Sequence, residues 1–160
     1  MKFSTIIPLA AAATASPLIP TPAIRPMLPI DVFNVTRFGA SSIPHSTSST
    51  LGFNITVTSI SPSTECSGYA PGYQWVGNFP VTNCSEPTVA FSLTRGENNS
   101  ATLDIFWRLG DKGLMQGTHY IPGSQFEYRG EHTSVKNIYV GPSDFTISNL
   151  TLVRSIWGDD

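Results

Sequence analysis

The sequence predicts an all-β protein: a small antiparallel β-barrel or a tightly curled sandwich, held by one disulfide. Short segments in which apolar and polar residues alternate recur along the chain, and this period of two is typical of half-buried strands. Turn residues separate the segments at near-regular spacing, as they do in barrels and sandwiches. No window after the N-terminal segment keeps the 3.6-residue period of a helix. The chain of 160 residues is short enough for one domain, which we place at residues 30–154.

The N-terminal end has the features of a secretory signal peptide over residues 1–15. Lys2 precedes an apolar run, and Ala13-Thr14-Ala15 provides small residues for cleavage, which is the order that signal peptides share. The run is shorter than the roughly 20 apolar residues that span a bilayer. The alternative is a buried helix of the mature fold. Residues 16–29 are spaced by prolines, which remove amide donors and favour extended backbone, so we expect a disordered leader.

The segment Thr50–Ile60 is the clearest strand of the first half. Its apolar residues are β-branched, aliphatic or aromatic and alternate with Gly, Asn and Thr, which suits a half-buried strand. The expected inward side chains are Leu51, Phe53, Ile55 and Val57. Around it we expect a strand at Ile30–Phe38, a flexible loop at Gly39–Ser49 and a strand end at Pro62. We then expect a turn at Ser67–Gly72, a short aromatic strand at Tyr73–Val76 and an irregular stretch at Pro80–Pro87.

An antiparallel hairpin is the most specific local prediction. Thr88–Thr94 and Ala101–Trp107 both alternate, and Arg95–Ser100 between them has the composition of a turn. Gly110–Gly113 is a further expected turn.

The last part of the chain is expected to form several short strands. They are Thr118–Ile121, Gln125–Tyr128, Ser134–Val140 and Asp144–Arg154. In the last of them the apolar residues change parity, and a period-two face cannot do this without an extra residue. We therefore predict a bulge or break near Ser148–Asn149, followed by a tail at residues 155–160.

Two cysteines, Cys66 and Cys84, are present. In a secreted chain an even pair is typical of one disulfide, and a loop of this length stabilises the fold by about 3 kcal/mol in the chain-entropy model. The alternatives are two free thiols or an intermolecular bridge.

Charge and composition exclude some classes of partner. Charged residues make up 12% of the chain and the net charge is -2, which gives no electrostatic footprint for nucleic acid or anionic membranes. A neutral, Ser- and Thr-rich surface suits an extracellular glycoprotein. The N-x-S/T motif of N-glycosylation occurs at Asn34, Asn54, Asn83, Asn98 and Asn149. Asn98 ranks first because it lies in the expected hairpin tip, and Asn83 last because Cys84 is its middle residue.

The order of these features resembles a known family. The residues that carry the resemblance are Ile30–Phe38, Leu51-Gly-Phe-Asn-Ile55, Glu65-Cys-Ser67, Cys84, the hairpin at 89–107 and the closing segment Phe145–Val153. In them the chain is similar to the small secreted fungal proteins named for the major Alternaria allergen, which also include hypersensitive-response-inducing elicitors. The resemblance covers residues 31–154.

The resemblance implies a compact β-barrel, secretion, and no established catalytic centre or cofactor. Members are associated with allergenicity, with plant defence, with binding of plant thaumatin-like defence proteins and with flavonoid-type ligands. The type member's additional cysteines have no counterpart here, so a covalent dimer is not expected, and non-covalent assembly stays open. The predicted function is that of a secreted allergen- or elicitor-like effector, not an enzyme, that binds a plant defence protein or a small phenolic outside the cell.

Two other functions are compatible with the sequence. His119, Glu127, Arg129 and His132 lie close together in sequence, and a secreted ribonuclease uses such groups as general base, general acid and phosphate clamp. The alternative is that they form the polar faces and turns of two short strands. A cell-wall-associated structural protein is the third interpretation.

Tyr69, Tyr73 and Trp75 lie near Cys66 in the sequence. They either pack on the disulfide as core or form an exposed patch for a partner or a planar ligand, since Trp and Tyr dominate interface energetics. No cluster of His, Asp and Glu has the spacing of a zinc site, and no metal is expected.

Overall fold

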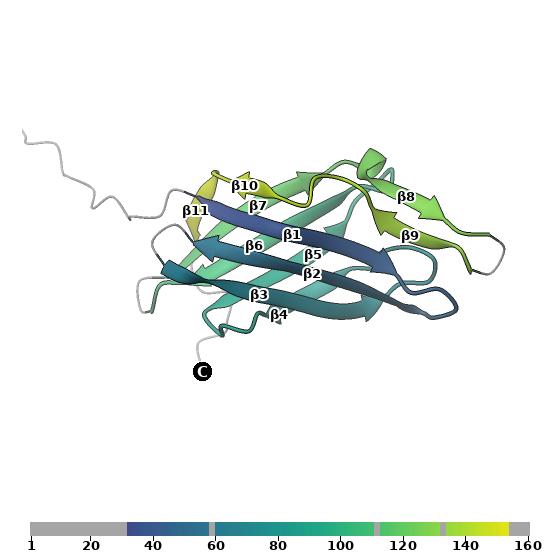
Figure 1. Cartoon of the computed structure of the whole chain (residues 1–160). Helices are drawn as coiled ribbons and strands as arrows, with labels where there is room; N and C mark the ends of the chain where they lie inside the picture. The colour runs from purple at the N-terminus through teal and green to yellow at the C-terminus, as the bar shows by residue number, and fades with distance from the viewer. Residues whose placement is uncertain (1–31, 58–59, 111–112, 132–133, 154–160) are drawn as a thin grey trace, which may run out of the picture.

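The protein consists of two antiparallel β-sheets packed face to face (Figure 1). The computed structural model describes residues 32–57, 60–110, 113–131 and 134–153. Within these ranges there are eleven strands and one short 3₁₀ turn, Gly123–Gln125. The predicted signal peptide, leader and C-terminal tail lie outside the described residues.

The first sheet, here the β1 sheet, has six strands in the order β3-β2-β1-β9-β8, with β10 also paired to β1. Its strands are β1 (Phe33–Ser42), β2 (Ser48–Val57), β3 (Ile60–Pro71), β8 (Phe126–Arg129), β9 (Lys136–Tyr139) and β10 (Phe145–Ile147).

The second sheet, here the β6 sheet, has five strands in the order β11-β7-β6-β5-β4. Its strands are β4 (Phe79–Asn83), β5 (Val89–Arg95), β6 (Ala101–Arg108), β7 (Leu114–Ile121) and β11 (Leu150–Val153). The two sheets do not close into a barrel, so of the two predicted architectures the sandwich is the one formed.

The core lies between the sheets and follows the alternation read from the sequence. The four apolar residues of β2 are all buried, as predicted. They face residues of the β6 sheet such as Phe91, Leu103 and Ile105, which are fully buried. The rings of Phe53 and Phe91 meet edge to face with centroids 5.3 Å apart, and such pairs add about 0.5–1.5 kcal/mol to the burial itself.

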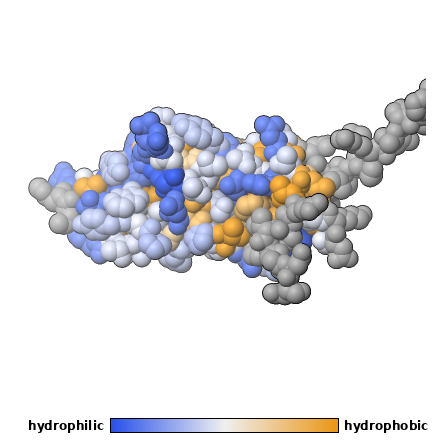
Figure 2. Space-filling model, turned by 180° about the vertical axis from the view of Figure 1, so that it is seen from behind, coloured by the Kyte–Doolittle hydropathy of each residue, from blue (hydrophilic) through white to orange (hydrophobic). Residues whose placement is uncertain are grey.

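A smaller apolar cluster lies on the outer face of the β6 sheet. Ala90, Phe106 and Leu114 are buried there, and Val153 packs against them. The surrounding surface mixes polar and apolar side chains (Figure 2).

The predicted hairpin is confirmed as β5 and β6. Their register runs from Val89 opposite Trp107 to Arg95 opposite Ala101. At the tip Asn98 and Asn99 have φ angles of 53° and 62°, in the left-handed region that asparagine tolerates better than most residues.

The predicted break at Ser148–Asn149 is also confirmed. β10 ends before it and pairs with β1, whereas β11 begins after it and pairs with β7. The change of apolar parity thus marks the point where the chain leaves one sheet for the other.

Several predictions about the first half were wrong because edge strands tolerate residues that central strands exclude. β3 continues through Pro62 and through the predicted turn at Ser67–Gly72, and β4 occupies part of the predicted irregular stretch Pro80–Pro87. Both strands are sheet edges, where the missing amide of proline need not break a ladder.

The predicted loop at Gly39–Ser49 and strand at Tyr73–Val76 were also wrong. β1 extends to Ser42, and β2 already begins at Ser48. The buried Ser49 hydroxyl donates to the Ala70 carbonyl at 3.1 Å and accepts the Gly77 amide at 3.0 Å. Serine is therefore part of the interior here. Residues 73–76 form an irregular loop in which Gln74 has a φ of 60°.

Candidate functional site

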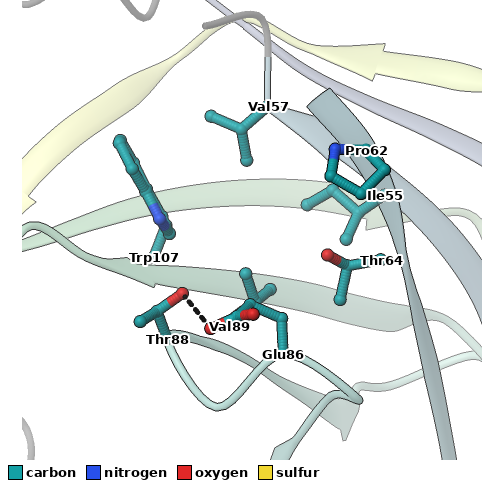
Figure 3. A pocket seen from close by; sticks show the side chains of 8 residues that line it. All are labelled: Ile55, Val57, Pro62, Thr64, Glu86, Thr88, Val89 and Trp107. Atoms are coloured by element: carbon teal, nitrogen blue, oxygen red, sulfur yellow. Dashed lines mark hydrogen bonds between the residues drawn. The ribbon is translucent and has the colours of Figure 1, made fainter. Parts of the chain in front are cut away.

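An apolar pocket of about 230 Å³ opens between the two sheets (Figure 3). β2 and β3 of the β1 sheet form one wall, and β5, β6 and the turn before β5 form the other. The lining residues are Ile55, Val57, Pro62, Thr64, Glu86, Thr88, Val89 and Trp107.

Strand register places Trp107 in this pocket. Trp107 is opposite Val89 on one side and Met115 on the other, and both neighbours are buried. Alternation therefore turns the indole toward the β1 sheet. Only 9% of Trp107 is exposed, so the pocket has one large aromatic face beside the aliphatic side chains of Ile55, Val57 and Val89.

The polar groups of the pocket lie mainly along one edge. The Thr88 hydroxyl donates to Oε1 of Glu86 at 3.2 Å, and Glu86 is exposed. Thr64 faces the pocket from β3, where it is opposite Ile55. A carboxylate at the rim of an apolar cavity can accept a hydrogen bond from a ligand hydroxyl, and bonds to charged groups are the stronger ones.

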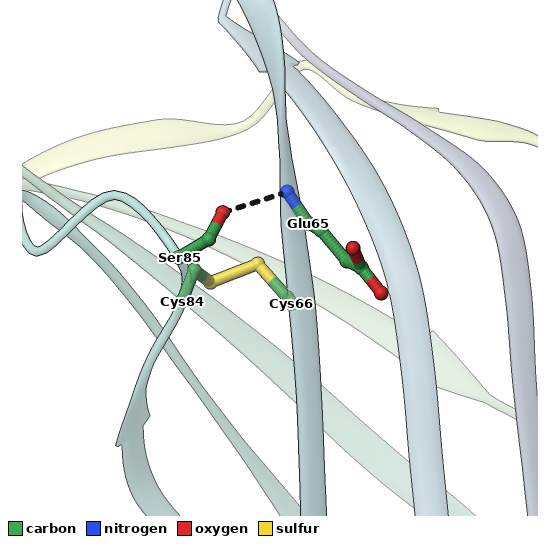
Figure 4. Close-up of a disulfide and its surroundings, with 4 residues drawn as sticks. All are labelled: Glu65, Cys66, Cys84 and Ser85. Carbon is green, nitrogen blue, oxygen red and sulfur yellow. Dashed lines mark hydrogen bonds between the residues drawn. A yellow bond between two sulfur atoms is a disulfide. The ribbon is translucent and has the colours of Figure 1, made fainter.

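The disulfide lies next to this edge and confirms the predicted pairing of Cys66 with Cys84 (Figure 4). The two Cα atoms are 4.3 Å apart. The Ser85 amide donates to the Glu65 carbonyl at 2.8 Å, and the Glu65 amide donates to the Ser85 hydroxyl at 3.2 Å. Since Thr64 and Glu86 each lie two residues from a cysteine, the bridge holds both walls of the pocket together.

The residues of the ribonuclease interpretation are divided between the sheets. His119 is on β7 of the β6 sheet, whereas Glu127 and Arg129 are on β8 of the β1 sheet. Glu127 and Arg129 form an exposed ion pair at 3.0 Å. His132 lies outside the described residues.

His119 faces the space between the sheets. It is opposite the buried Leu103 and stacks on the Phe145 ring with centroids 4.0 Å apart. Burial in this apolar environment lowers the pKa of His119 below its ordinary value. The structure thus gives the side chain a packing role against Phe145, and the lowered pKa favours its neutral form.

The aromatic residues Tyr69, Tyr73 and Trp75 do not form a core around the disulfide. They are 78%, 53% and 49% exposed, respectively. Tyr69 projects from the outer face of β3, opposite Thr50, and the other two lie on the following loop. The alternative in which they pack on the disulfide as core is therefore wrong, and all three side chains are available at the surface.

Apart from Asn83, the glycosylation candidates differ in their surroundings. Asn98 and Asn149 are exposed in turns. Asn34 is on β1, and its Oδ1 accepts the Thr146 hydroxyl at 3.0 Å. Asn54 is on the outer face of β2, between Thr36 and Glu65.

Among the described residues there is no group of three or more His, Cys, Asp or Glu placed to hold a metal ion. None of the helices in this part of the chain is long and apolar enough to cross a membrane.

Sequence reasoning missed the pocket. Its lining comes from four strands and a turn, and only their register shows which side chains meet. The alternation of its strand predicts that Trp107 points inward, and this was the one indication in the sequence. The same pattern is equally typical of a core residue.

These features define a class: a small β-sandwich with a disulfide between its sheets. Two solved structures of the Alternaria alternata allergen Alt a 1 are similar to this chain. One superposes with a TM-score of 0.52 at 19% identity, covering 78% of this chain and 90% of the allergen. The other gives 0.49 at 18% identity, covering 78% and 96%. The chain therefore has an Alt a 1-like fold, which confirms at the level of the fold the resemblance seen in the sequence.

No protein-family model matches the sequence, and no curated protein matches it at a significant level.

Proposed function

We propose that this protein is a secreted, allergen- or elicitor-like binding protein that takes a small neutral phenolic in the Trp107 pocket. The observation that carries the proposal is the pocket itself: an indole face, an aliphatic lining and a hydrogen-bonding edge formed by Glu86 and Thr88. A planar ring gains contact with the indole, and its hydroxyl can donate to Glu86.

The size of the pocket bears on the ligand class. Its 230 Å³ lies below the roughly 300–1,000 Å³ of pockets for drug-sized ligands. This favours a phenolic of one or two rings over a three-ring flavonoid. A ligand of this size is expected to bind with a Kd of about 10–500 μM.

Location outside the cell rests on other observations. The signal-peptide pattern of residues 1–15 and the pairing of both cysteines favour an oxidising compartment. The proposed activity is recognition without turnover of substrate, and no cofactor is involved.

Tryptophan fluorescence tests the pocket, with coniferyl alcohol as the neutral phenolic and quercetin as the three-ring comparison. Coniferyl alcohol should quench the wild type and the Trp75→Phe variant equally, and Trp107→Phe should lose the saturable part. Thr64→Phe, which fills the pocket, should weaken binding at least about tenfold, measured by calorimetry. Equal quenching of Trp107→Phe and the wild type would refute the pocket as the site.

Absence of catalysis is tested directly. The purified protein should leave RNA intact over hours. RNA cleavage that Glu127→Ala abolishes would overturn the binding proposal in favour of the ribonuclease.

The exposed patch of Tyr69, Tyr73 and Trp75 favours a second, protein-binding function. Aromatic side chains with this exposure are typical anchors of interfaces, and a plant defence protein of the thaumatin-like kind is the proposed partner. Capture from plant apoplastic fluid should fall in Trp75→Ala and persist in Tyr120→Ala, whose side chain is 63% exposed but lies on the other sheet. Equal capture by both variants would remove the patch from consideration.

A further inference from the structure

A groove of about 470 Å³ crosses the outer face of the β1 sheet. At its centre Gly39 of β1 is paired with Gly52 of β2. Arg37, Asn54 and Glu65 are among the residues that line it. Its volume is within the range of about 300–1,000 Å³ that is typical of ligand sites.

The fold itself does not require either glycine. A Cβ atom at Gly39 would meet nothing within 4 Å, and one at Gly52 would meet only the Cys66 carbonyl oxygen at 3.8 Å. Neither residue has the left-handed backbone that favours glycine. Glycine within a strand often marks a bulge or the close approach of a ligand. The bulge of β1 directly precedes Gly39, whereas Gly52 lies in a regular part of the β1–β2 pairing, so the bulge does not account for Gly52.

A bulge in β1 brings a cation to the rim of the groove. The register shifts between Thr36 and Gly39, and Arg37 has a φ of 56°. The Arg37 amide donates to Oδ1 of Asp144 at 2.8 Å, which holds the irregular backbone in place. Bulges commonly re-aim a side chain in this way, and here the exposed Arg37 lines the same groove as Glu65 of β3.

Asn54 connects this groove with a covalent modification. It lies two residues after Gly52, so both are on the outer face of β2, and Thr56 completes the Asn54-Ile-Thr56 motif on that face. The Asn54 side chain has no hydrogen-bond partner among the described residues, whereas the Oδ1 of Asn34 accepts the Thr146 hydroxyl.

We infer that Asn54 carries an N-linked glycan whose first sugar lies in the groove. The C–H face of the sugar covers the backbone at Gly39 and Gly52, and its hydroxyl groups reach Arg37 and Glu65. The inference rests on the secretion included in the proposed function.

The modification takes place on the unpaired nascent chain, with a lipid-diphosphate-linked oligosaccharide as co-reactant. Nδ2 of Asn54 forms a bond to the anomeric carbon and gives up one proton. The bond from that carbon to the diphosphate oxygen breaks, and the lipid diphosphate leaves with the electron pair. When β2 pairs afterwards, the outward direction of Asn54 keeps the sugar outside the core.

Glycopeptide mass spectrometry of the full chain, secreted from a yeast host, tests the assignment. Asn54 should be occupied in the wild type and in Thr56→Ser, which keeps the motif, and unoccupied in Thr56→Ala. Enzymatic deglycosylation of the folded protein should release the Asn54 glycan about tenfold more slowly than one on Asn98, which corresponds to about 1.4 kcal/mol of groove contacts. Gly52→Thr, which narrows the groove, should remove most of this difference.

Three results would overturn the inference. Secreted protein with Asn54 unmodified would refute it and leave the proposed function intact. If Asn54 is occupied but its glycan is released as fast from the wild type as from Gly52→Thr, the glycan does not lie in the groove, and this part of the inference is refuted. Retention of the chain inside the cell with residues 1–15 uncleaved would refute secretion and the glycan together.

Discussion

Removing the disulfide should cost this protein a large part of its stability. Cys66 and Cys84 are separated by 18 residues, and for a loop of this length the chain-entropy model gives about 3 kcal/mol. The two flanking hydrogen bonds between Glu65 and Ser85 can persist without the bridge, so they do not add to this loss. In a domain of this size 3 kcal/mol corresponds to a fall in Tm of about 10 °C.

The assay is urea denaturation of the Cys66→Ala/Cys84→Ala double variant beside the wild type. The free energy of unfolding in water should fall by about 3 kcal/mol. The m value should rise, because the unfolded chain without the cross-link is more expanded and exposes more surface. Ser85→Ala is the matched control: it removes the hydroxyl acceptor of one flanking bond and should cost less than about 1 kcal/mol. A loss below about 1 kcal/mol in the double variant would contradict the entropic reasoning.

The same double variant tests the link between bridge and pocket. Because Thr64 and Glu86 lie close to the two cysteines on opposite walls, loss of the bridge should weaken coniferyl alcohol binding even well below the unfolding temperature. Unchanged affinity in the folded variant would show that the walls are held by strand pairing alone.

Three further predictions concern packing and protonation. Because burial lowers the folded-state pKa of His119, the unfolded chain takes up this proton first as pH falls below about 6.5. Stability should then decline by at most about 1.4 kcal/mol per pH unit until the folded-state pKa is reached. Thermal melts should show this slope in wild type and His45→Gln but a shallower one in His119→Gln. Gly117→Val should cost about 1–3 kcal/mol, since even a Cβ there comes within 3.0 Å of side chains from β1, β10 and β11. Gly39→Val, whose Cβ meets nothing within 4 Å, should change stability by less than about 0.5 kcal/mol. Leu103→Ala, at a fully buried site, should cost about 2–5 kcal/mol in urea denaturation.

Strands with one buried face could be predicted from sequence because their patterning is strong. The alternating residues of β2 and the hairpin of β5 and β6 appear where expected, and the parity change near Ser148 proved to be a transfer between sheets. In each case the period of two leaves few other strand registers, because a shift by one residue would turn the apolar side chains toward solvent.

Edge strands and tertiary features could not be read in this way. β3 contains Pro62 and several serines, which are turn signals in sequence, yet an edge position accepts them. The pairing of Gly39 with Gly52 depends on a bulge at Arg37. Without that bulge the register of β1 against β2 would differ by one residue, and other residues would be paired. The pocket around Trp107 likewise requires the facing of two sheets, which no local pattern encodes.

The sandwich is fastened along both of its long margins. On one side the cysteine bridge ties β3 to the chain that follows β4, and on the other the short link from β10 to β11 passes from layer to layer. Because covalent links join the two sheets at both margins, the sheets cannot separate by rotation about one edge. Exchange of a guest in the Trp107 pocket should therefore depend on local motion of the side chains that line it, and not on separation of the two sheets.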